Sequence, residues 1–556
     1  MTTRRLLNRG FTRVLLTTAA LALASACGDA GRPDAGRDDG PAPRPEVPEA
    51  ERYGGTVVVA RRNDIGSMNA FESLDIESQQ HQIHLLFVTL VRGDERDDPL
   101  PYLARSWSFT EDSAAVTFEL HRGLTWHDGT PLTARDVEFT YERARDPAVG
   151  YPNHAYFDAW NGVELLDEYT LRFTIRPMAN LFFGWTRLPI LPEHVLGDVP
   201  PAELAGHPFG STEPVGAGPF RFVERSAGDR WVFEANPDFP DELGGRPYVD
   251  RYVYRVIAED ATRAAALRTG EIDLLMPVAP ANLPRFAADS AIRLLEYREG
   301  DYDFIVWNPR RPMFADRAVR RALTMAIDRQ GIVEAVHEGA ATVATGPVGP
   351  WHWAYDSTDV ALDHAPDSAR AALEAAGWTD ADGDGVREKD GRPFSFTMFV
   401  TPRDKWRSIA TIVQSNLADV GVEMEIEVRE IASLQPLVTS PDRRFDAFML
   451  TWVPDPTMDG RSMWACDQVA HPVHFSSYCN PELDAVLDSL LSATDREVYA
   501  RLVDRYNDIL AEDQPYTFLY HPTHHAAARV ELRGVEMDVG GNWATVADWW
   551  LEPAAR

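Results

Sequence analysis

The sequence predicts an α/β protein, because segments with a helical pattern alternate with segments that read as strands over several hundred residues. The first strand signal is the apolar run 56–60, which follows Gly54 and Gly55 and reads as a buried strand. The clearest signal is the segment 406–430, where a helical pattern gives way to strict alternation. A chain of 556 residues exceeds one hydrophobic core and predicts about three domains at roughly 150 residues each.

Two helix signals stand in the middle of the chain. Asp260 is expected to cap the helix of ATRAAALRT, Gly270 to end it, and EIDLLM to return as a strand. Further on, Asp316 opens one helical segment that runs to residue 336. Its apolar residues fall on one helix face: Val319, Leu323, Ala326 and Ile327.

The segment 406–430 combines both patterns in one unit. Its helix carries Ile409, Ile412, Val413 and Leu417 and ends near Gly421. A strand with one buried face follows, in which apolar residues alternate with glutamates: Val422, Met424, Ile426 and Val428.

Composition narrows the class of partner. Hydrophobic residues make up 44% of the chain and aromatic residues 10%, which is enough to bury large cores. The formal net charge of −32 argues against nucleic acid, because phosphate binding needs clustered lysine and arginine. It fits an acidic protein that binds small molecules or cationic groups.

The N-terminus predicts export and a lipid anchor. Four arginines (Arg4, Arg5, Arg9 and Arg13) precede the apolar run VLLTTAALALASA, which has the length of a signal-peptide core. The run ends at Ala-Ser-Ala-Cys27, which resembles the bacterial lipobox, although Ala24 stands where leucine is usual. The alternatives are an ordinary signal peptide or a membrane helix with a chance cysteine, but the run falls short of the about 20 residues of a span.

We therefore expect residues 1–27 to be a lipoprotein signal peptide that ends at an acylated Cys27. Residues 28–52 are rich in Gly, Pro and Asp and predict a flexible tether. The protein is then expected in the periplasm or at the outer face of the cytoplasmic membrane.

Two cysteines remain after Cys27, and two histidines lie between them. Cys466, His471, His474 and Cys479 are residue types that bind zinc well. An even pair of cysteines in an oxidising compartment usually forms a disulfide instead. The residues alone leave both alternatives open.

Two further motifs are read as structural. His127-Asp128 could serve general acid–base chemistry, but no nucleophile or orienting partner is evident. Asp128-Gly129 makes a good turn, and Thr133 can cap a helix that starts at Ala134. No nucleophile elbow, His-Glu-x-x-His or phosphate loop is present in the sequence, so no enzyme, catalytic residue or cofactor is predicted.

The acidic segment DADGDGVREKDG (380–391) follows the start of a calcium loop. Position twelve, where a bidentate glutamate should stand, is Gly391. An acidic turn between a helix and a strand is the favoured interpretation.

Five segments together resemble one family, the extracytoplasmic solute-binding proteins of peptide and nickel ABC importers, called solute-binding family 5. The resemblance covers nearly all of residues 53–556. The segments that carry it, in the family's order, are LPYLARSWSFTEDSAAVTFELHRGLTWHDGTPLTARDVEFTYERARD (100–146), PVGAGPFRFVE (214–224), ALRTGEIDLL (266–275), FADRAVRRALTMAIDR (314–329) and GWTDADGDGVREKDGRPFSF (377–396).

The resemblance implies a two-lobed periplasmic-binding-protein fold of the class II type. Two α/β lobes, joined by two crossing segments, close over a ligand in the cleft between them. Lobe one is expected to take residues 53–305 and 515–556, with an extra domain at about 83–209, and lobe two residues 306–514.

It also implies capture of di- or oligopeptides for an ABC permease and its ATPase subunits, by a monomer. Asp455 stands where peptide-binding members present an aspartate to the peptide's ammonium group, although it could instead match a structural Asp-Pro. Trp452 could stack on the ligand or simply pack. A disulfide between Cys466 and Cys479 would close the loop just after Asp455. Further ligand candidates are Ser67, Met68, Trp307, Asn308, Trp351 and Trp353.

Alternative functions remain at this point. The same fold could capture nickel, a metal chelate or an oligosaccharide, and His81, His84 and the HPTHH run at 521–525 favour a metal weakly. No metal site is assigned. An exported hydrolase on this scaffold is the alternative from another class, and it would require loss of turnover when a carboxylate or His127 is changed.

Overall fold

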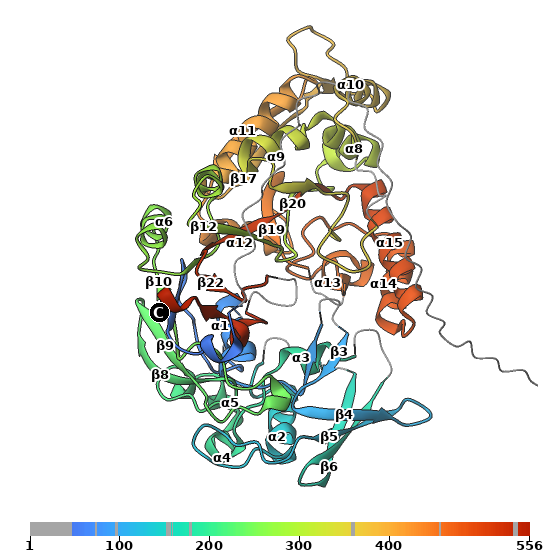
Figure 1. Cartoon of the computed structure of the whole chain (residues 1–556). Helices are drawn as coiled ribbons and strands as arrows, with labels where there is room; N and C mark the ends of the chain where they lie inside the picture. Colours follow the sequence, from blue (N-terminus) through green and yellow to red (C-terminus); the bar gives the residue numbers. More distant parts are fainter. Residues whose placement is uncertain are drawn as a thin grey trace, which may run out of the picture. The chain divides into compact units, whose positions relative to one another are not determined.

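The computed structural model describes residues 47–72, 75–94, 98–151, 157, 159–176, 181–356, 362–454, 458–537 and 543–555. Pro48–Arg556 forms one compact unit (Figure 1). Cys27 and Asp455 lie outside the described residues, as do the expected signal peptide and most of the tether. Within the described residues, no helix has both the length and the apolar composition needed to cross a membrane.

A seven-stranded sheet, here called sheet one, contains the first predicted strand near its centre. That strand pairs in parallel with β10 and β11, and all other neighbours are antiparallel. In spatial order the strands are β12 (Ile292–Tyr297), β21 (His524–Arg529), β11 (Leu274–Leu275), β1 (Thr56–Arg61), β10 (Arg251–Val256), β9 (Arg230–Ala235) and β8 (Phe220–Ser226).

Two helices cover one face of sheet one through a small apolar cluster: α6 (Asp260–Thr269) and α7 (Leu283–Ala287). As predicted, Gly270 ends α6, with a φ of 79° that a glycine adopts without strain. Asp260 is the first helical residue, and the cap position is Glu259, whose side chain makes no capping hydrogen bond. The predicted strand EIDLLM shortens to Leu274–Leu275.

The other face of sheet one shares a continuous core with a four-stranded sheet, the centre of the expected extra domain. As predicted, Thr133 caps α2 (Ala134–Arg145), and the Asp136 carboxylate accepts from the Thr133 N–H in return at 2.9 Å. The strands are β4 (Ala104–Phe109), β5 (Ala115–Leu120), β7 (Thr170–Ile175) and β6 (Trp160–Asp167). This part of the fold also contains the short helices α1 (Ile76–His81), α3 (Phe183–Arg187), α4 (Glu193–Leu196) and α5 (Pro201–Leu204). His81 of α1 packs against Phe233 and Tyr252 of sheet one.

A six-stranded sheet, sheet two, is covered by helices on both faces. Its strands are β14 (Ala341–Val343), β20 (Tyr516–Pro522), β13 (Tyr302–Trp307), β19 (Ala447–Trp452), β17 (Ser395–Val400) and β18 (Glu423–Val428). One face packs on α8 (Arg317–Ala326), α9 (Arg329–His337), α10 (Pro366–Ala375) and α11 (Asp404–Ala418). The other packs on α12 (Ile431–Thr439), α13 (Arg461–Trp464), α14 (Pro481–Ser492) and α15 (Arg496–Asp513) (Figure 1).

The predicted unit at 406–430 is confirmed as α11 followed by β18, with Gly421 at a φ of 79° between them. Val428, expected on the buried face of this strand, is 42% exposed. The single helix predicted from Asp316 to residue 336 is wrong. It breaks at Ile327, which is extended at φ −88° and ψ 121°, because the Asp328 side chain accepts from the Gly331 N–H at 2.8 Å and starts a second helix.

The chain passes between the two large sheets twice. The first passage lies at residues 298–301, between β12 of sheet one and β13 of sheet two, and the second is Thr523, between β20 and β21. The boundaries expected after residues 305 and 514 would assign the first part of β13 and all of β20 to lobe one, whereas both strands belong to sheet two. We refer to sheet one with the four-stranded sheet as lobe one, and to sheet two with its helices as lobe two. The described residues also form three two-stranded pairs: β2 (Val91–Gly93) with β3 (Pro99–Pro101), β15 (Glu388–Lys389) with β16 (Arg392–Pro393), and β22 (Leu532–Arg533) with β23 (Trp550–Leu551).

Candidate functional site

The end of β19 brings the first candidate residue to the surface of lobe two. Trp452, its last residue, pairs with Tyr302 of β13 and lies half-buried, with its ring edge-on to Phe475 at 6.3 Å. The next residue, Val453, is 58% exposed. The chain therefore leaves sheet two for solvent directly before Asp455, whose own position is not described.

The chain that follows is tightly fixed where it re-enters lobe two. A side chain at Gly460 would place its Cβ 2.7 Å from Trp464 Cδ1 and 2.8 Å from the Tyr506 hydroxyl, so only glycine fits. Trp464 is fully buried, and its indole N–H donates to the Tyr506 hydroxyl at 2.8 Å. This packing fixes the chain from Gly460 to Trp464, which follows Asp455 in the sequence.

A disulfide closes the next loop. Cys466 and Cys479 are bonded at an S–S distance of 2.09 Å, which confirms the predicted disulfide. The zinc alternative at this loop is wrong, because the bonded sulfurs are no longer thiolates that could coordinate the ion. His471 is exposed, whereas His474 is buried.

A buried arginine, which the sequence did not single out, ties the disulfide loop to the start of β19. Arg443 is 1% exposed. Its guanidinium donates to the carbonyl of His471 at 2.6 Å and to those of Val438 and Ser440 at 3.1 and 2.9 Å. The chain before β19 and the loop after it are thereby held together.

Asp303 and its partners form a second group that the sequence did not single out. Where β13 pairs with β19, Asp303 and Thr451 form the pair next to the one that includes Trp452, and they therefore point to the other face of sheet two. Asp303 is completely buried and forms an ion pair with Lys405 Nζ at 2.8 Å. The hydroxyls of Thr451 and Tyr520 donate to its two carboxylate oxygens. Burial, and secondly the charge of Asp303, raise the pKa of Tyr520 well above its ordinary value. The only sequence signal was a charged residue inside the apolar strand YDFIVW.

Trp351 and Trp353 lie on different sides of one loop in lobe two. The Trp351 ring lies against the first passage, where a Cβ at Gly300 would be 3.3 Å away. Trp353 stacks on Tyr499 at 5.6 Å, and the Arg496 guanidinium lies 4.0 Å from its ring centroid. Arg496 also forms an ion pair with Asp98 of lobe one, so Trp353 is next to a contact between the lobes.

The structure buries Ser67 and Met68 inside lobe one, at 1% and 0% exposure. The Ser67 hydroxyl accepts from the Asn69 N–H at 3.0 Å, its carbonyl accepts from Gln82 Nε2 at 2.8 Å, and the Met68 N–H donates to the Gly210 carbonyl at 2.8 Å. These bonds hold the loop after β1, and neither side chain is open to a ligand in this state.

Trp307 and Asn308 are equally enclosed, in the core of lobe two. The Trp307 indole N–H donates to the Thr517 hydroxyl at 2.9 Å, and the Asn308 amide donates to the carbonyls of Arg443 and Phe445 at 3.0 and 2.7 Å. Both side chains connect β13 to its neighbours, a packing arrangement that the sequence position did not reveal.

The surroundings of His127 indicate a structural role. Its Nε2 lies 3.0 Å from the Gly218 carbonyl, and burial lowers the pKa of His127 to about 4. The neighbouring Asp128 carboxylate accepts from the Thr130 N–H at 2.9 Å and lies 2.8 Å from His194 Nε2. The pair holds a turn, as the sequence predicted.

The histidines that favoured a metal are dispersed. His81 is buried in lobe one, with its ring nitrogens 2.6 Å from the Glu77 carbonyl and 2.8 Å from the Tyr252 hydroxyl. His524 lies 2.9 Å from Asp301 at the second passage, and His525 lies 3.8 Å from Glu296.

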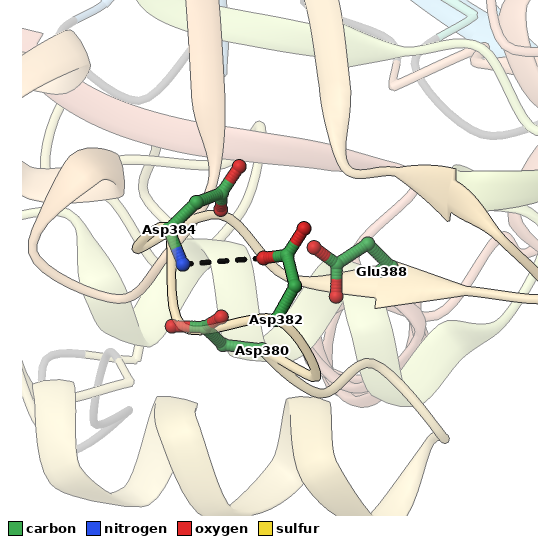
Figure 2. A group of neighbouring side chains, drawn as sticks. All are labelled: Asp380, Asp382, Asp384 and Glu388. Carbon is green, nitrogen blue, oxygen red and sulfur yellow. Dashed lines mark hydrogen bonds between the residues drawn. The ribbon is translucent and has the colours of Figure 1, made fainter.

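Within the described ranges, one group of side chains could hold a metal ion, and it is acidic. Ligand atoms of Asp380, Asp382, Asp384 and Glu388 lie within 4.8 Å of one another (Figure 2). Glu388 is the ninth residue of the loop, whereas position twelve, where the calcium-loop pattern has its glutamate, is Gly391. Carboxylate oxygens suit calcium, but the turn also satisfies itself, since Asp380 accepts from the Gly383 N–H at 2.7 Å.

Comparisons with known proteins agree with the fold. A family model described as bacterial extracellular solute-binding proteins, family 5 Middle, matches residues 98–470. The oligopeptide-binding protein AppA of Bacillus subtilis (strain 168) is 31% identical over 510 residues, 90% of this chain and 92% of that protein. The probable D,D-dipeptide-binding periplasmic protein DdpA of Escherichia coli (strain K12) is 27% identical over 448 residues, 78% of this chain and 81% of that protein.

Solved structures have the same fold as this chain. The structure of AppA from Bacillus subtilis in complex with a nonapeptide has a TM-score of 0.75 at 30% identity, covering 90% of this chain and 99% of that one. NikA from Brucella suis in complex with Fe(III)-EDTA has a TM-score of 0.78 at 21% identity, covering 89% and 100%, and this likeness concerns the fold alone. The predicted two-lobed α/β fold is confirmed.

Proposed function

The chain belongs to the bacterial extracellular solute-binding proteins, family 5, and on that premise we propose that it captures peptides and delivers them to the permease of an ABC importer. The observation that carries the proposal is the match to an oligopeptide-binding protein over 90% of this chain, together with the fold of its nonapeptide complex. Both lobes are included in that match.

In this proposal the peptide's ammonium group pairs with Asp455. A buried ammonium needs a carboxylate partner, and Asp455 stands in the chain between Trp452 at the end of β19 and the tightly packed Gly460. Trp452 and the tryptophans of the 349–355 loop, Trp351 and Trp353, provide apolar surface for ligand side chains. Ser67, Met68, Trp307 and Asn308 support the two lobes from inside, and any ligand contact would come from the backbone beside them.

The cellular setting is part of the same proposal. Cys27 carries the lipid anchor, the residues up to about 52 form the tether, and the monomeric body binds its ligand outside the cytoplasm. Closure of the lobes is driven by contacts that the ligand makes to both. The permease and its ATPase subunits follow from the family and not from any residue of this chain.

The test combines native mass spectrometry with a charge-specific substitution. The protein, purified from an export-competent host, is mixed with synthetic di- to nonapeptides, and retained masses should be released as intact peptides on denaturation. Asp455→Ala should then weaken binding of a free-amino peptide by roughly tenfold to a hundredfold, the value of a charged hydrogen bond, and leave its N-acetylated form almost unchanged.

Asp467→Ala is the matched control, because this aspartate lies in the same region but is exposed and pairs with Arg461 at 3.2 Å. Equal losses for the free and acetylated peptides would remove the ammonium role. A single adduct with the mass of a metal chelate or a sugar, with no peptide retained, would overturn peptide capture.

A further inference from the structure

A small pocket in lobe one concentrates positive charge, against a net charge of −32 for the whole chain. Its volume is about 200 Å³. At about 30 Å³ per water molecule this is room for roughly seven waters, which suits one side chain or one terminal residue rather than a whole peptide. Its principal lining residues are Ile83, His84, Arg92, Leu100, Tyr102 and Arg187.

Arg92, in β2, is a pre-positioned cation at this pocket. Its guanidinium carbon lies 3.7 Å from the centroid of the Tyr102 ring, and Nη2 donates to the Leu243 carbonyl at 3.3 Å. Stacking on an aromatic ring fixes the planar guanidinium and leaves further N–H groups for an anion. Burial raises the pKa of Asp548, and the charge of Arg92, which lies within reach of that carboxylate, has the smaller, opposite effect and lowers it.

His84 is the second group that points to an anion. Burial, followed by the positive charges of Arg92 and Arg187, lowers the pKa of His84 to about 3, so the imidazole is neutral at physiological pH. Its Nε2 is buried and has no hydrogen-bond partner in the described part of the chain. A buried polar nitrogen without a partner is costly, and a ligand oxygen would satisfy it.

The remaining walls are apolar and suit the stem of an acidic group. Ile83 and Tyr102 are buried, whereas Leu100 is 46% exposed at the mouth. Methylene groups can pack on these side chains while a carboxylate reaches the arginines. A carboxylate also accepts two parallel N–H bonds from one guanidinium.

The pocket also borders the contact between the lobes. The β2–β3 hairpin supplies Arg92 and Leu100, and Asp98 in the same hairpin forms an ion pair with Arg496 of α15 in lobe two. A ligand held between the lobes would therefore pass close to this pocket.

We propose that the pocket formed by His84, Arg92 and Arg187 binds a carboxylate of the captured ligand, supplied either by an acidic side chain or by the C-terminus of a peptide. This inference rests on the proposed function and makes it more specific. It predicts a preference for peptides that present a carboxylate to lobe one.

The first measurement uses a small probe that does not depend on peptide capture. Glutarate should raise the melting temperature of the wild-type protein, and uncharged glutaramide should not. The glutarate shift should be lost in Arg92→Gln and in Arg187→Gln. It should remain in Arg105→Gln, a control arginine in the same lobe that pairs with Glu119 at 2.8 Å.

The second measurement uses peptides in pairs. A glutamate is moved along an alanine pentapeptide and compared at each position with glutamine, and the C-terminal acid is compared with its amide. We expect one of these carboxylates to improve wild-type affinity by about tenfold or more, the value of a charged hydrogen bond. That preference should fall below about threefold in Arg92→Gln, and Arg92→Lys should restore part of it.

A glutamate preference would identify a side-chain carboxylate, and an acid-over-amide preference the C-terminus. The inference is overturned if glutarate has no effect on the wild type and all carboxylates are bound no better than their neutral counterparts, or if both effects survive in Arg92→Gln and Arg187→Gln. A glutarate shift that needs both arginines, with no peptide bound at all, would support the pocket and overturn peptide capture.

Discussion

An ion pair inside lobe two and an ion pair between the lobes differ in how far their side chains are exposed to solvent. Asp303 is 0% exposed, and its partner Lys405 is 32% exposed. Asp98 and Arg496, which join lobe one to lobe two, are 51% and 40% exposed. Both are carboxylate–cation pairs, but removing one partner from a buried pair leaves an uncompensated charge, whereas water replaces a lost partner at the surface.

The difference is in keeping with the closure of the lobes proposed above. Around β19, the Asp303–Lys405 ion pair, a disulfide and the Arg443 hydrogen bonds keep lobe two in one arrangement. Between the lobes, the contact is exposed and easily broken. The ion pair at the passages has an intermediate exposure, since the His524 and Asp301 side chains are 22% and 12% exposed. The expected effects of substitution fall in the same order.

The largest effect is expected at Asp303. Asp303→Ala should reduce the free energy of unfolding of lobe two by about 3 kcal/mol, because Lys405 and the Tyr520 and Thr451 hydroxyls lose their partner in a buried site. Urea unfolding followed by circular dichroism measures it. Asp238→Ala is the control, since this aspartate is 81% exposed, and equal losses in the two variants would break the comparison.

The disulfide is expected to contribute slightly less. Changing Cys466 and Cys479 together to serine should cost about 2–3 kcal/mol, because the unfolded chain is no longer closed across a separation of 13 residues. Thermal unfolding with and without reductant measures the effect. Reductant should lower the melting temperature of the wild type and leave the double variant unchanged. A wild type insensitive to reductant at full reduction would show that packing alone holds the loop.

Local patterns could be predicted wherever the sequence itself decides the structure. The helix–Gly421–strand unit, the Thr133 cap and the stop at Gly270 follow from periodicity and from residues next to one another. The two-lobed fold followed from the family resemblance and not from periodicity. The break at Ile327 was missed because an apolar residue continues the helical pattern, while the competing cap at Asp328 ends it.

The site could be predicted only in part, because its supports depend on the tertiary fold. Cys466 and Cys479 were paired correctly from the resemblance and their even number. Asp303 and Lys405 are 102 positions apart, so no local signal connects them, and β13 and α11 meet only when sheet two forms. Burial of Met68 and Trp307 was likewise invisible in a linear pattern, because it depends on segments far away in the chain.

At the passages, a pH-dependent effect of intermediate size is expected. Burial lowers the pKa of His524, but the hydrogen bond and charge of Asp301 outweigh it, so the pKa lies above its ordinary value. The folded protein therefore holds this proton more tightly. The stabilisation is complete below the unfolded pKa of about 6.5 and is lost as pH rises through the folded pKa.

Comparison with His524→Asn isolates this contribution from the other histidines. The wild type should exceed the variant in melting temperature most at pH 6 and below, and the difference should shrink toward pH 9, with a total change of less than about 1 kcal/mol for a partly exposed pair. His471→Asn, at an exposed histidine of lobe two, is the control substitution. A difference that stays constant from pH 6 to pH 9 would contradict the pairing with Asp301.

The smallest effect is expected at the contact between the lobes. Asp98→Ala and Arg496→Gln should each change the free energy of unfolding by about 0.5 kcal/mol or less, and a double-mutant cycle should give a coupling in the same range that disappears at high salt. Arg496 stacks on Trp353 in addition, so the single variant at Arg496 should cost more than the one at Asp98. A coupling above about 1.5 kcal/mol would mean that the contact holds the lobes together without a ligand. In that case peptide affinity would show how the contact acts. If the ligand must first separate the lobes, Asp98→Ala should raise the affinity for a peptide. If the contact helps to close the lobes over the peptide, Asp98→Ala should lower that affinity.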